Sequence, residues 1–278
     1  MKAIVCTKYG SPDVLQIAEL AKPIPKHNEV LIKIHATAVT ASDCIVRAFN
    51  VPISLRFPMG IALGFRRPRR PVLGMVLAGE IESVGNDVTS FKQGDKIFAC
   101  DFDRFVFGMY AEYIAFPEKG LLVSKPDNIS YEQAAAVPYG GLLALHYLKK
   151  GNIQSGQKVL IYGASGAIGT MAVQLAKYFG ADVTGVCSTS NLELVTSLEA
   201  NSVIDYTKED FTKRGDRYDL ILNAVGKRKA KLQCQDALTP NGKHITVDDG
   251  SPKVRVEDLI FLKELAKAGH IQAVIDRC

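Results

Sequence analysis

The sequence lacks the cysteine and histidine patterns that build metal sites. Its six cysteines are scattered along the chain, and no two of them form a C-x-x-C motif. This excludes a cysteine zinc ribbon. The five histidines are equally dispersed, and no pair of them has the spacing of metal ligands. We therefore expect no metal site, and free buried thiols in a reducing compartment.

Long apolar runs and a large charge excess are also missing. No apolar stretch is long enough to span a bilayer, and the N-terminal MKAIVCTKYGSPDVLQIAEL lacks the apolar core and cleavage site of a signal peptide. The net charge of +5 is modest for 278 residues, and no interleaved basic and aromatic surface is evident. These absences predict a cytoplasmic, globular protein that binds neither membrane nor nucleic acid.

The stretch 159–183 has the pattern of a strand, a glycine-rich turn and a helix. Val159–Tyr162 predict a buried strand, and from Met171 apolar residues recur at helical spacing until Gly180. Such a turn presents backbone N–H groups and a helix N-terminus to a phosphate, and side chains there would collide with a pyrophosphate or with the strand behind. The pattern predicts dinucleotide binding. The turn is marked by Gly163, Gly166 and Gly169.

Two other interpretations of this turn stay open. In an unrelated α/β protein the glycines would only ease close packing. The run Gly163–Ala167 also approaches the G-x-S-x-G nucleophile elbow of esterases, with Ser165 as the nucleophile. The fifth position is not glycine, however, and the base would have to be His244, the only later histidine at a plausible strand end.

Strands and helices alternate after this turn. Strands are predicted over 183–187, 202–204, 218–223 and 244–247, and helices over 192–198, 231–238 and 256–268. An earlier helix begins at Ser130, with Gln133 completing a capping box, and is expected to break at Pro138 and Gly140–Gly141. The order specifies an α/β Rossmann domain at 125–266, a doubly wound parallel sheet. Its ligand should lie at the carboxyl ends of the first and fourth strands, beside the turn 223–226.

The first 124 residues predict a β-rich domain instead. Strands are expected over 1–5, 29–34, 75–85, 94–98 and 108–115, and Thr40–Cys44 is a turn that starts a short helix. Residues 49–71 are expected to form a long surface loop with one helical turn at most. The arginine cluster Arg66–Arg70 in this loop is expected to be solvated.

The turn after the second Rossmann strand favours NADP(H) over NAD(H). A ribose with free hydroxyls is normally held by an acidic side chain there, but residues 187–191 contain no carboxylate. Hydroxyl and amide groups leave room for a 2′-phosphate, which a carboxylate would repel. The candidate contacts are Ser188, Thr189 and Asn191, with Tyr206 at the end of the third strand as a further hydroxyl donor.

Motifs along nearly the whole chain resemble a known family. They are TASDCIVR, PVLGMVLAGEIESVG, FKQGDKIF, GMYAEY, AAAVPYGGL and SGQKVLIYGASGAIGTMAVQLAK. Together they resemble the zinc-independent quinone oxidoreductase branch of the medium-chain dehydrogenase/reductase superfamily. The resemblance implies a GroES-like catalytic domain at 1–124 beside the Rossmann domain. The positions that match the catalytic zinc ligands of other members hold Thr40, Gly74–Val76 and the vicinity of Pro138, so all three ligands are absent.

The resemblance implies hydride transfer from NADPH to a quinone or to the β-carbon of an activated alkene. It places the nicotinamide in a cleft between the domains, near Thr40, Ser42, Asp43, Tyr139 and Val225. Further implied contacts are the backbones of Ser165, Ala167 and Ile168 with the pyrophosphate, Gly226 with the cofactor, and Tyr110 and Arg47 as weaker candidates for lining the cleft.

Three further expectations follow from the resemblance. Relatives often form homodimers through the sheet edge. They also continue beyond the point that matches 267–278, where this chain would only begin its return to the first domain. An enal or enoyl-thioester reductase, with Arg66–Arg70 as a basic patch, and a non-catalytic NADPH-binding protein stay open as alternatives.

Overall fold

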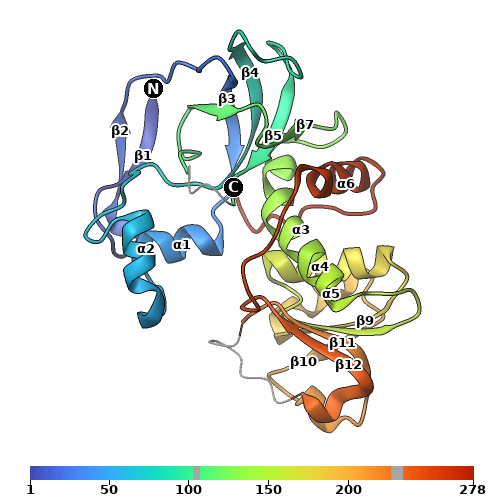
Figure 1. The fold of residues 1–278 in the computed structure, drawn as a ribbon. Helices are drawn as coiled ribbons and strands as arrows, with labels where there is room; N and C mark the ends of the chain where they lie inside the picture. Colours follow the sequence, from blue (N-terminus) through green and yellow to red (C-terminus); the bar gives the residue numbers. More distant parts are fainter. Residues whose placement is uncertain (103–106, 227–233) are drawn as a thin grey trace. The chain divides into compact units, whose positions relative to one another are not determined.

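A computed structural model of the chain describes residues 1–102, 107–226 and 234–278. It divides into two compact units, Met1–Pro138 with Ile275–Cys278, and Tyr139–Val274 (Figure 1). The division falls inside a helix, later than the expected boundary at 124/125. The start of that helix belongs to the first unit, where the ring of Tyr131 stacks on His35 with centroids 4.5 Å apart.

The first unit is built on a five-stranded antiparallel sheet in the order β6-β3-β4-β5-β7. Its apolar core is formed by residues that alternate along these strands, such as Val30 and Ile32 of β3 and Ile97 of β5. The strands are β3 (Glu29–Thr37), β4 (Val76–Val84), β5 (Lys96–Cys100), β6 (Tyr113–Pro117) and β7 (Leu121–Ser124). A two-stranded antiparallel sheet of β1 (Lys2–Cys6) and β2 (Leu15–Glu19) lies in the same unit, and η1 (Pro12–Val14) is part of the connection between the two strands.

Two helices of the first unit lie between β3 and β4 in the sequence. They are α1 (Ala41–Ala48) and α2 (Arg56–Leu63), and η2 (Ile53–Leu55) leads into α2. The prediction of a long surface loop with one helical turn over 49–71 is therefore wrong, because the segment forms η2 and the eight-residue helix α2. Pro58 occupies the first turn of α2, where a missing N–H costs no helical hydrogen bond, so it does not prevent the helix.

The second unit contains a five-stranded parallel sheet in the order β10-β9-β8-β11-β12. This order confirms the Rossmann prediction and makes β8 and β11, the first and fourth strands, neighbours. The strands are β8 (Lys158–Tyr162), β9 (Asp182–Cys187), β10 (Ser202–Asp205), β11 (Tyr218–Asn223) and β12 (Leu238–Thr246). The helices are α4 (Ala167–Tyr178), α5 (Leu192–Ser197) and α6 (Val256–Lys267), with short turns η3 (Thr189–Asn191), η4 (Phe211–Lys213) and η5 (Gln235–Ala237).

The helix α3 (Tyr131–Gly151) is continuous, so the predicted break at Pro138 and Gly140–Gly141 is wrong. The two glycines serve close packing instead. A Cβ on Gly140 would lie 2.1 Å from the carbonyl oxygen of Ala167, and one on Gly141 would lie 2.8 Å from Leu262 of α6. The capping box that begins the helix is confirmed, since Gln133 N–H donates to Ser130 Oγ at 3.2 Å and Ser130 N–H donates to Gln133 Oε1 at 2.8 Å.

The remaining expectations have mixed outcomes. The helix predicted over 231–238 falls partly on 231–233, outside the described residues, and from Gln235 onward the chain forms η5 and then β12. All six cysteines are free, but Cys44 and Cys278 are exposed rather than buried.

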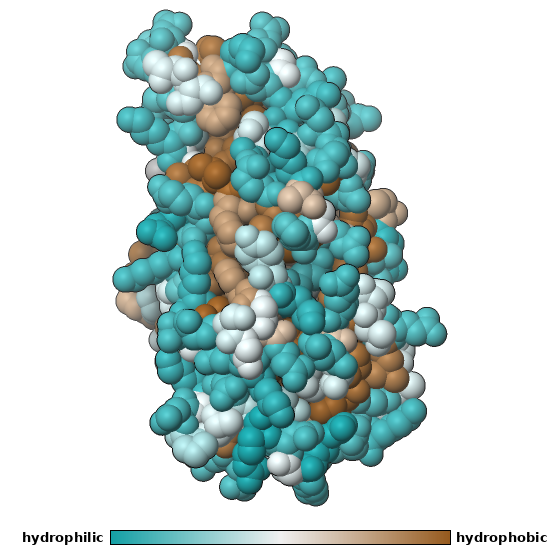
Figure 2. All heavy atoms as spheres, turned by 90° about the vertical axis from the view of Figure 1, so that its right-hand side faces the viewer, coloured by the Kyte–Doolittle hydropathy of each residue, from teal (hydrophilic) through white to brown (hydrophobic). Residues whose placement is uncertain are grey.

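Hydrophilic residues cover most of the face in Figure 2. Among the described residues, no helix has the length and apolar character needed to cross a bilayer.

Candidate functional site

The turn between β8 and α4 lies at the carboxyl edge of the parallel sheet. Gly163 has a φ of +82°, which favours glycine, and the N–H groups of Gly163 and Ala164 donate to the carbonyl of Val186 at 3.0 and 2.9 Å. These bonds fix the turn to the end of β9. Gly166 is the N-cap residue of α4 and has a φ of −80°.

The three glycines of the turn differ in what surrounds them. A Cβ on Gly163 would lie 2.4 Å from Val225, and one on Gly169 would lie 2.0 Å from the carbonyl oxygen of Gly163. Both are therefore dictated by the fold. A Cβ on Gly166 would meet only the oxygen of Gly163, at an ordinary 3.6 Å, so nothing in the described protein requires glycine there. The space that a side chain at Gly166 would fill is therefore left open beside the start of α4.

The N-terminus of α4 is open to a ligand. Gly166 and Ala167 are exposed, Ser165 and Ile168 are half-buried, and no side chain among the described residues caps this helix end. The first N–H groups of a helix have no partner within the helix and carry the positive end of its dipole. Ser165, Ala167 and Ile168, the predicted pyrophosphate contacts, therefore surround a site suited to an anion.

The end of β11 forms the neighbouring side of this site. Asn223 is fully buried, and its Oδ1 accepts hydrogen bonds from the N–H groups of Val225 and Gly226 at 3.0 and 3.1 Å. Ala224 N–H donates to the carbonyl of Tyr162 at 2.9 Å, which joins this turn to the end of β8. The predicted contacts Val225 and Gly226 are thereby held beside the glycine turn.

The predicted 2′-phosphate residues lie on the adjacent strand end. Asn191 Nδ2 donates to Ser188 Oγ at 2.9 Å, and Thr189 Oγ1 donates to the carboxylate of Asp205. Asp205 also accepts from the N–H and Oγ1 of Thr207 at 3.0 and 2.7 Å. The hydrogen bonds from Thr189 and Thr207 lower the pKa of Asp205 to about 2. The region thus contains a carboxylate after all, but its oxygens are engaged by these hydroxyls.

Sequence reasoning missed both Asp205 and its basic neighbour. Lys208 Nζ lies 3.7 Å from Asp205 Oδ2, and the lysine side chain is largely exposed. This supplies a cation beside Thr189, whereas residues 187–191 contain none. The signal was the run Asp205–Lys208 at the end of the third strand, which the pairing of β10 with β9 brings next to η3. Tyr206 in the same run is 52% exposed and faces Tyr162 with ring centroids 6.1 Å apart.

The esterase interpretation is weakened by the register of the sheet. His244 pairs with Ile221, which pairs with Leu160, so the histidine lies level with the middle of β8. Ser165 follows the end of β8. The prediction that His244 stands at a strand end is therefore wrong, and the histidine is not at the edge where Ser165 lies.

In the first unit, Thr40 and Asp43 form a capping box at the start of α1. Asp43 Oδ2 accepts from the N–H and Oγ1 of Thr40 at 2.8 and 2.6 Å, and Asp43 N–H donates to Thr40 Oγ1 at 3.3 Å. Burial raises the pKa of Asp43, and the bonds from Thr40 lower it by less. The other carboxylate oxygen, Oδ1, is buried without a hydrogen bond among the described residues.

Tyr110 is the notable neighbour of Asp43. Its hydroxyl is buried, and burial together with the nearby Asp43 charge raises its pKa. The predicted site residue Ser42 is half-buried on α1 in the same unit. Tyr139 belongs to the second unit, where it is 7% exposed on α3. The structure thus brings Thr40, Ser42 and Asp43 together, and Tyr110 joins them.

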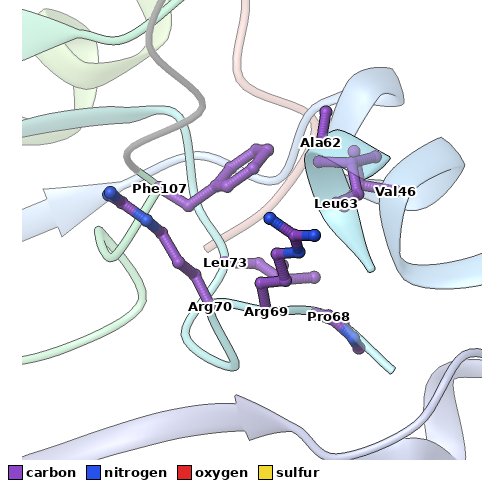
Figure 3. A pocket seen from close by; sticks show the side chains of 8 residues that line it. All are labelled: Val46, Ala62, Leu63, Pro68, Arg69, Arg70, Leu73 and Phe107. Atoms are coloured by element: carbon purple, nitrogen blue, oxygen red, sulfur yellow. The ribbon is translucent and has the colours of Figure 1, made fainter. Parts of the chain in front are cut away.

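A cavity of about 430 Å³ lies in the first unit. Figure 3 shows two arginine side chains rising from one short segment of its wall, with Phe107 and residues of α2 nearby. Its lining combines apolar residues with these two charges: Val46, Ala62, Leu63, Pro68, Arg69, Arg70, Leu73 and Phe107.

Metal-binding groups are not assembled in the described part of the chain. Within it, no three His, Cys, Asp or Glu side chains are placed so that they could hold a metal ion. The replaced positions Thr40 and Met75 are both buried, and Thr40 is occupied by its bonds to Asp43.

Two family models match the chain. Residues 26–127 match the alcohol dehydrogenase GroES-like domain, and residues 167–274 match a model described as zinc-binding dehydrogenase. The chain is 35% identical to the chloroplastic NADPH-dependent alkenal/one oxidoreductase of Arabidopsis thaliana, over 99% of this chain and 72% of the relative. It is 33% identical to the 2-methylene-furan-3-one reductase of Solanum lycopersicum, over 99% and 71%. The solved quinone oxidoreductase from Coxiella burnetii superposes with a TM-score of 0.86 at 26% identity, covering 100% of this chain and 90% of that one.

Proposed function

Since the chain belongs to the medium-chain dehydrogenase/reductase superfamily, among its quinone and alkenal oxidoreductases, we propose that it transfers a hydride from NADPH to a quinone or an α,β-unsaturated carbonyl. The reduced nicotinamide supplies the hydride when it is bound. The protein supplies the binding energy and the orientation of the two reactants.

The glycine turn carries this proposal. Gly163 and Gly169 are dictated by internal packing, whereas Gly166 leaves a cradle that a Cβ would fill. That cradle lies against the uncapped start of α4, where a diphosphate would accept backbone N–H bonds. The residues present therefore fit a dinucleotide, with Ser165, Ala167 and Ile168 against the pyrophosphate and Val225 and Gly226 beside them.

The preference for NADP(H) rests on the second strand end. Ser188, Thr189 and Asn191 offer hydroxyl and amide groups, and Lys208 adds a positive charge close to Thr189. Asp205 orients the Thr189 hydroxyl, and Lys208 offsets part of the negative charge of Asp205. We assign Lys208 to the 2′-phosphate as the basic contact, with Tyr206 as a hydroxyl donor.

The catalytic candidates are Thr40, Ser42, Asp43 and Tyr139, acting without zinc. Asp43 holds the backbone and hydroxyl of Thr40 in place and thereby positions the start of α1. Because burial raises its pKa, Asp43 is also poised to keep a proton at higher pH than an exposed aspartate. Thr40 and Met75 replace metal ligands, which favours chemistry by positioning rather than by a Lewis acid.

NADPH consumption with a panel of quinones, enals and an enoyl thioester tests the function. We expect turnover with at least one acceptor class, and loss of it in Gly166→Val. Tight NADPH binding without turnover of any acceptor would contradict the oxidoreductase proposal and favour a non-catalytic binding protein. Tighter binding of NADH than of NADPH in a fluorescence titration would contradict the cofactor preference alone.

One observation favours an enoyl-thioester reductase as the second candidate. The cavity of the first unit combines an apolar lining with Arg69 and Arg70, which suits an acyl chain that carries an anionic group. Turnover of the enoyl thioester that is much faster than turnover of the quinones would select this candidate.

A further inference from the structure

The segment between Asp43 and Glu80 has an extreme charge composition. It contains no acidic residue and no lysine, but six arginines: Arg47, Arg56, Arg66, Arg67, Arg69 and Arg70. The formal net charge of the whole chain is only +5, so this one segment holds a charge greater than that of the entire protein. The positive charge is therefore concentrated around α2.

The same segment exposes large apolar side chains. Ile53 is 83% exposed, Phe57 69% and Phe65 57%, and Leu55 and Ile61 are each about half exposed. We call these five residues the α2 patch. Only Gly60 and Leu63 of α2 are buried, so the helix buries one narrow side and leaves the rest to solvent. In Figure 1, α2 stands at the periphery of the first unit, beside α1 and away from the five-stranded sheet.

The α2 patch is an organised surface. Phe57 and Phe65 pack with ring centroids 5.9 Å apart. A Cβ on Gly60 would lie 2.3 Å from the Phe65 ring, so the missing side chain of Gly60 lets that ring lie across the helix. Exposed aromatic rings held in this way are costly in water, and a patch of this kind marks a surface that binds a partner.

Three arginines flank the α2 patch. Arg56, Arg66 and Arg67 are exposed, and no carboxylate within the described ranges pairs with any of them. Arg56 adjoins Phe57, and Arg66 and Arg67 follow Phe65 directly. Apolar side chains are thus bordered by guanidinium groups that no described carboxylate neutralises, the arrangement that interfacial helices use at a bilayer surface.

We propose that the α2 patch docks the protein on the surface of an anionic lipid bilayer. The aromatic and aliphatic side chains enter the headgroup region, and the flanking arginines contact lipid phosphates. A two-fold contact with a second copy fits less well, because it would set the same acid-free arginine segment against itself. With eight residues, α2 is suited to lie on a membrane and not to cross it. The α2 patch is a basic and aromatic surface that the sequence analysis did not expect, and the proposal departs from the expectation of no membrane binding. It is independent of the proposed enzymatic activity.

Co-sedimentation of the full chain with lipid vesicles tests the proposal. One set of vesicles contains phosphatidylcholine alone, and the other contains phosphatidylcholine mixed with phosphatidylglycerol. We expect binding to the mixed vesicles only, and weaker binding as ionic strength rises, because salt screens the arginines. Sedimentation with neither set, or equally with both, would overturn the proposal.

Paired variants identify the surface that binds. Arg66→Gln with Arg67→Gln should weaken partition roughly 30-fold, since each basic residue near an anionic membrane contributes about 5-fold. Phe57→Ser with Phe65→Ser should weaken it more than about 10-fold. The matched controls are Ile17→Ser with Ile24→Ser, which are 78% and 88% exposed in the same unit, and Lys8→Gln with Lys119→Gln. These should bind as the unaltered protein does.

Light scattering of the same samples tests whether the α2 patch binds a second copy of the chain instead of a membrane. Because all substituted side chains are exposed, each variant should keep the thermal unfolding midpoint of the parent protein. If the aromatic variant binds anionic vesicles as the parent does, the proposal is overturned. A dimer that this variant dissociates, together with no binding of the parent to vesicles, would overturn it as well and assign the α2 patch to a second copy.

Discussion

Replacing Gly166 with alanine is expected to abolish dinucleotide binding while the protein stays folded. The new Cβ would have its nearest protein contact at 3.6 Å, and the φ of −80° is one that any L-residue adopts. Alanine is a poorer N-cap than glycine by about 1 kcal/mol, but it also reduces the entropy of the unfolded chain by about 0.4–1 kcal/mol. The net change in the free energy of unfolding should therefore be within about 1 kcal/mol of zero.

The effect on binding should be much larger. The added methyl group would keep a pyrophosphate from the N–H groups at the start of α4. Hydrogen bonds to a charged group contribute about 1.5–3 kcal/mol each, so losing two of them costs roughly 3–6 kcal/mol. A loss of that size corresponds to an increase in Kd of more than about 100-fold.

Gly169→Ala is the matched variant with the opposite expectation. Its Cβ would lie 2.0 Å from the carbonyl oxygen of Gly163 and 2.8 Å from backbone atoms of Ala164, so the helix could not keep its place. Overpacking of this kind typically costs about 1–3 kcal/mol or more of folding stability. The two glycine substitutions, three residues apart, thus separate binding from folding.

Thermal unfolding with and without NADPH, together with a fluorescence titration, measures both effects. A ligand at 100 times its Kd stabilises the folded state by about 2.7 kcal/mol, so the parent protein should show a clear rise in Tm. Gly166→Ala should unfold near the parent Tm and show no rise. An unchanged NADPH affinity in this variant would refute the assignment of the glycine cradle.

Three further outcomes are expected. Lys208→Gln should lower the affinity for NADPH about 10-fold and leave the affinity for NADH unchanged, as measured by titration with Lys213→Gln as the control variant. An equal loss of affinity for both cofactors would contradict the 2′-phosphate role of Lys208. Because the pKa of Asp205 in the folded state is lowered to about 2, its stabilising contribution is complete above the ordinary aspartate pKa near 4 and is lost as pH falls toward 2. The free energy of urea unfolding should therefore depend less on pH between about 4 and 2 in Asp205→Asn than in the parent protein. The raised pKa of Asp43 has the opposite effect: the free energy of unfolding should decline as pH rises from about 4 to the pKa of Asp43 in the folded state, because ionisation disfavours that state. Asp43→Asn should remove this decline in urea unfolding. An unaltered pH profile would show that burial does not disfavour the ionised form of Asp43.

The features that could be predicted from sequence are those with local causes. The strand, glycine turn and helix at 158–178 follow from spacing alone, and so does the capping box of Ser130 and Gln133. The parallel sheet followed from the alternation of strands and helices, which requires crossover connections between the strands. Each of these depends on residues near one another in the chain.

The features that were missed depend on tertiary contacts. Gly140 and Gly141 resemble helix breakers until Ala167 and Leu262 are seen to press against them. Asp205 and Lys208 approach Thr189 only because β10 pairs with β9. Residue types alone could not show that a carboxylate, absent from the sequence after β9, arrives there from another strand.

The contact between Gly140 and the carbonyl of Ala167 has a consequence for protein engineering. The start of α4 is in close contact with the neighbouring helix α3, which lies outside the strand, turn and helix of the dinucleotide motif. A graft that transplants only residues 158–178 into another scaffold would leave that buttress behind. Attempts to transplant dinucleotide binding with this module should therefore carry the helix 131–151 along with the turn.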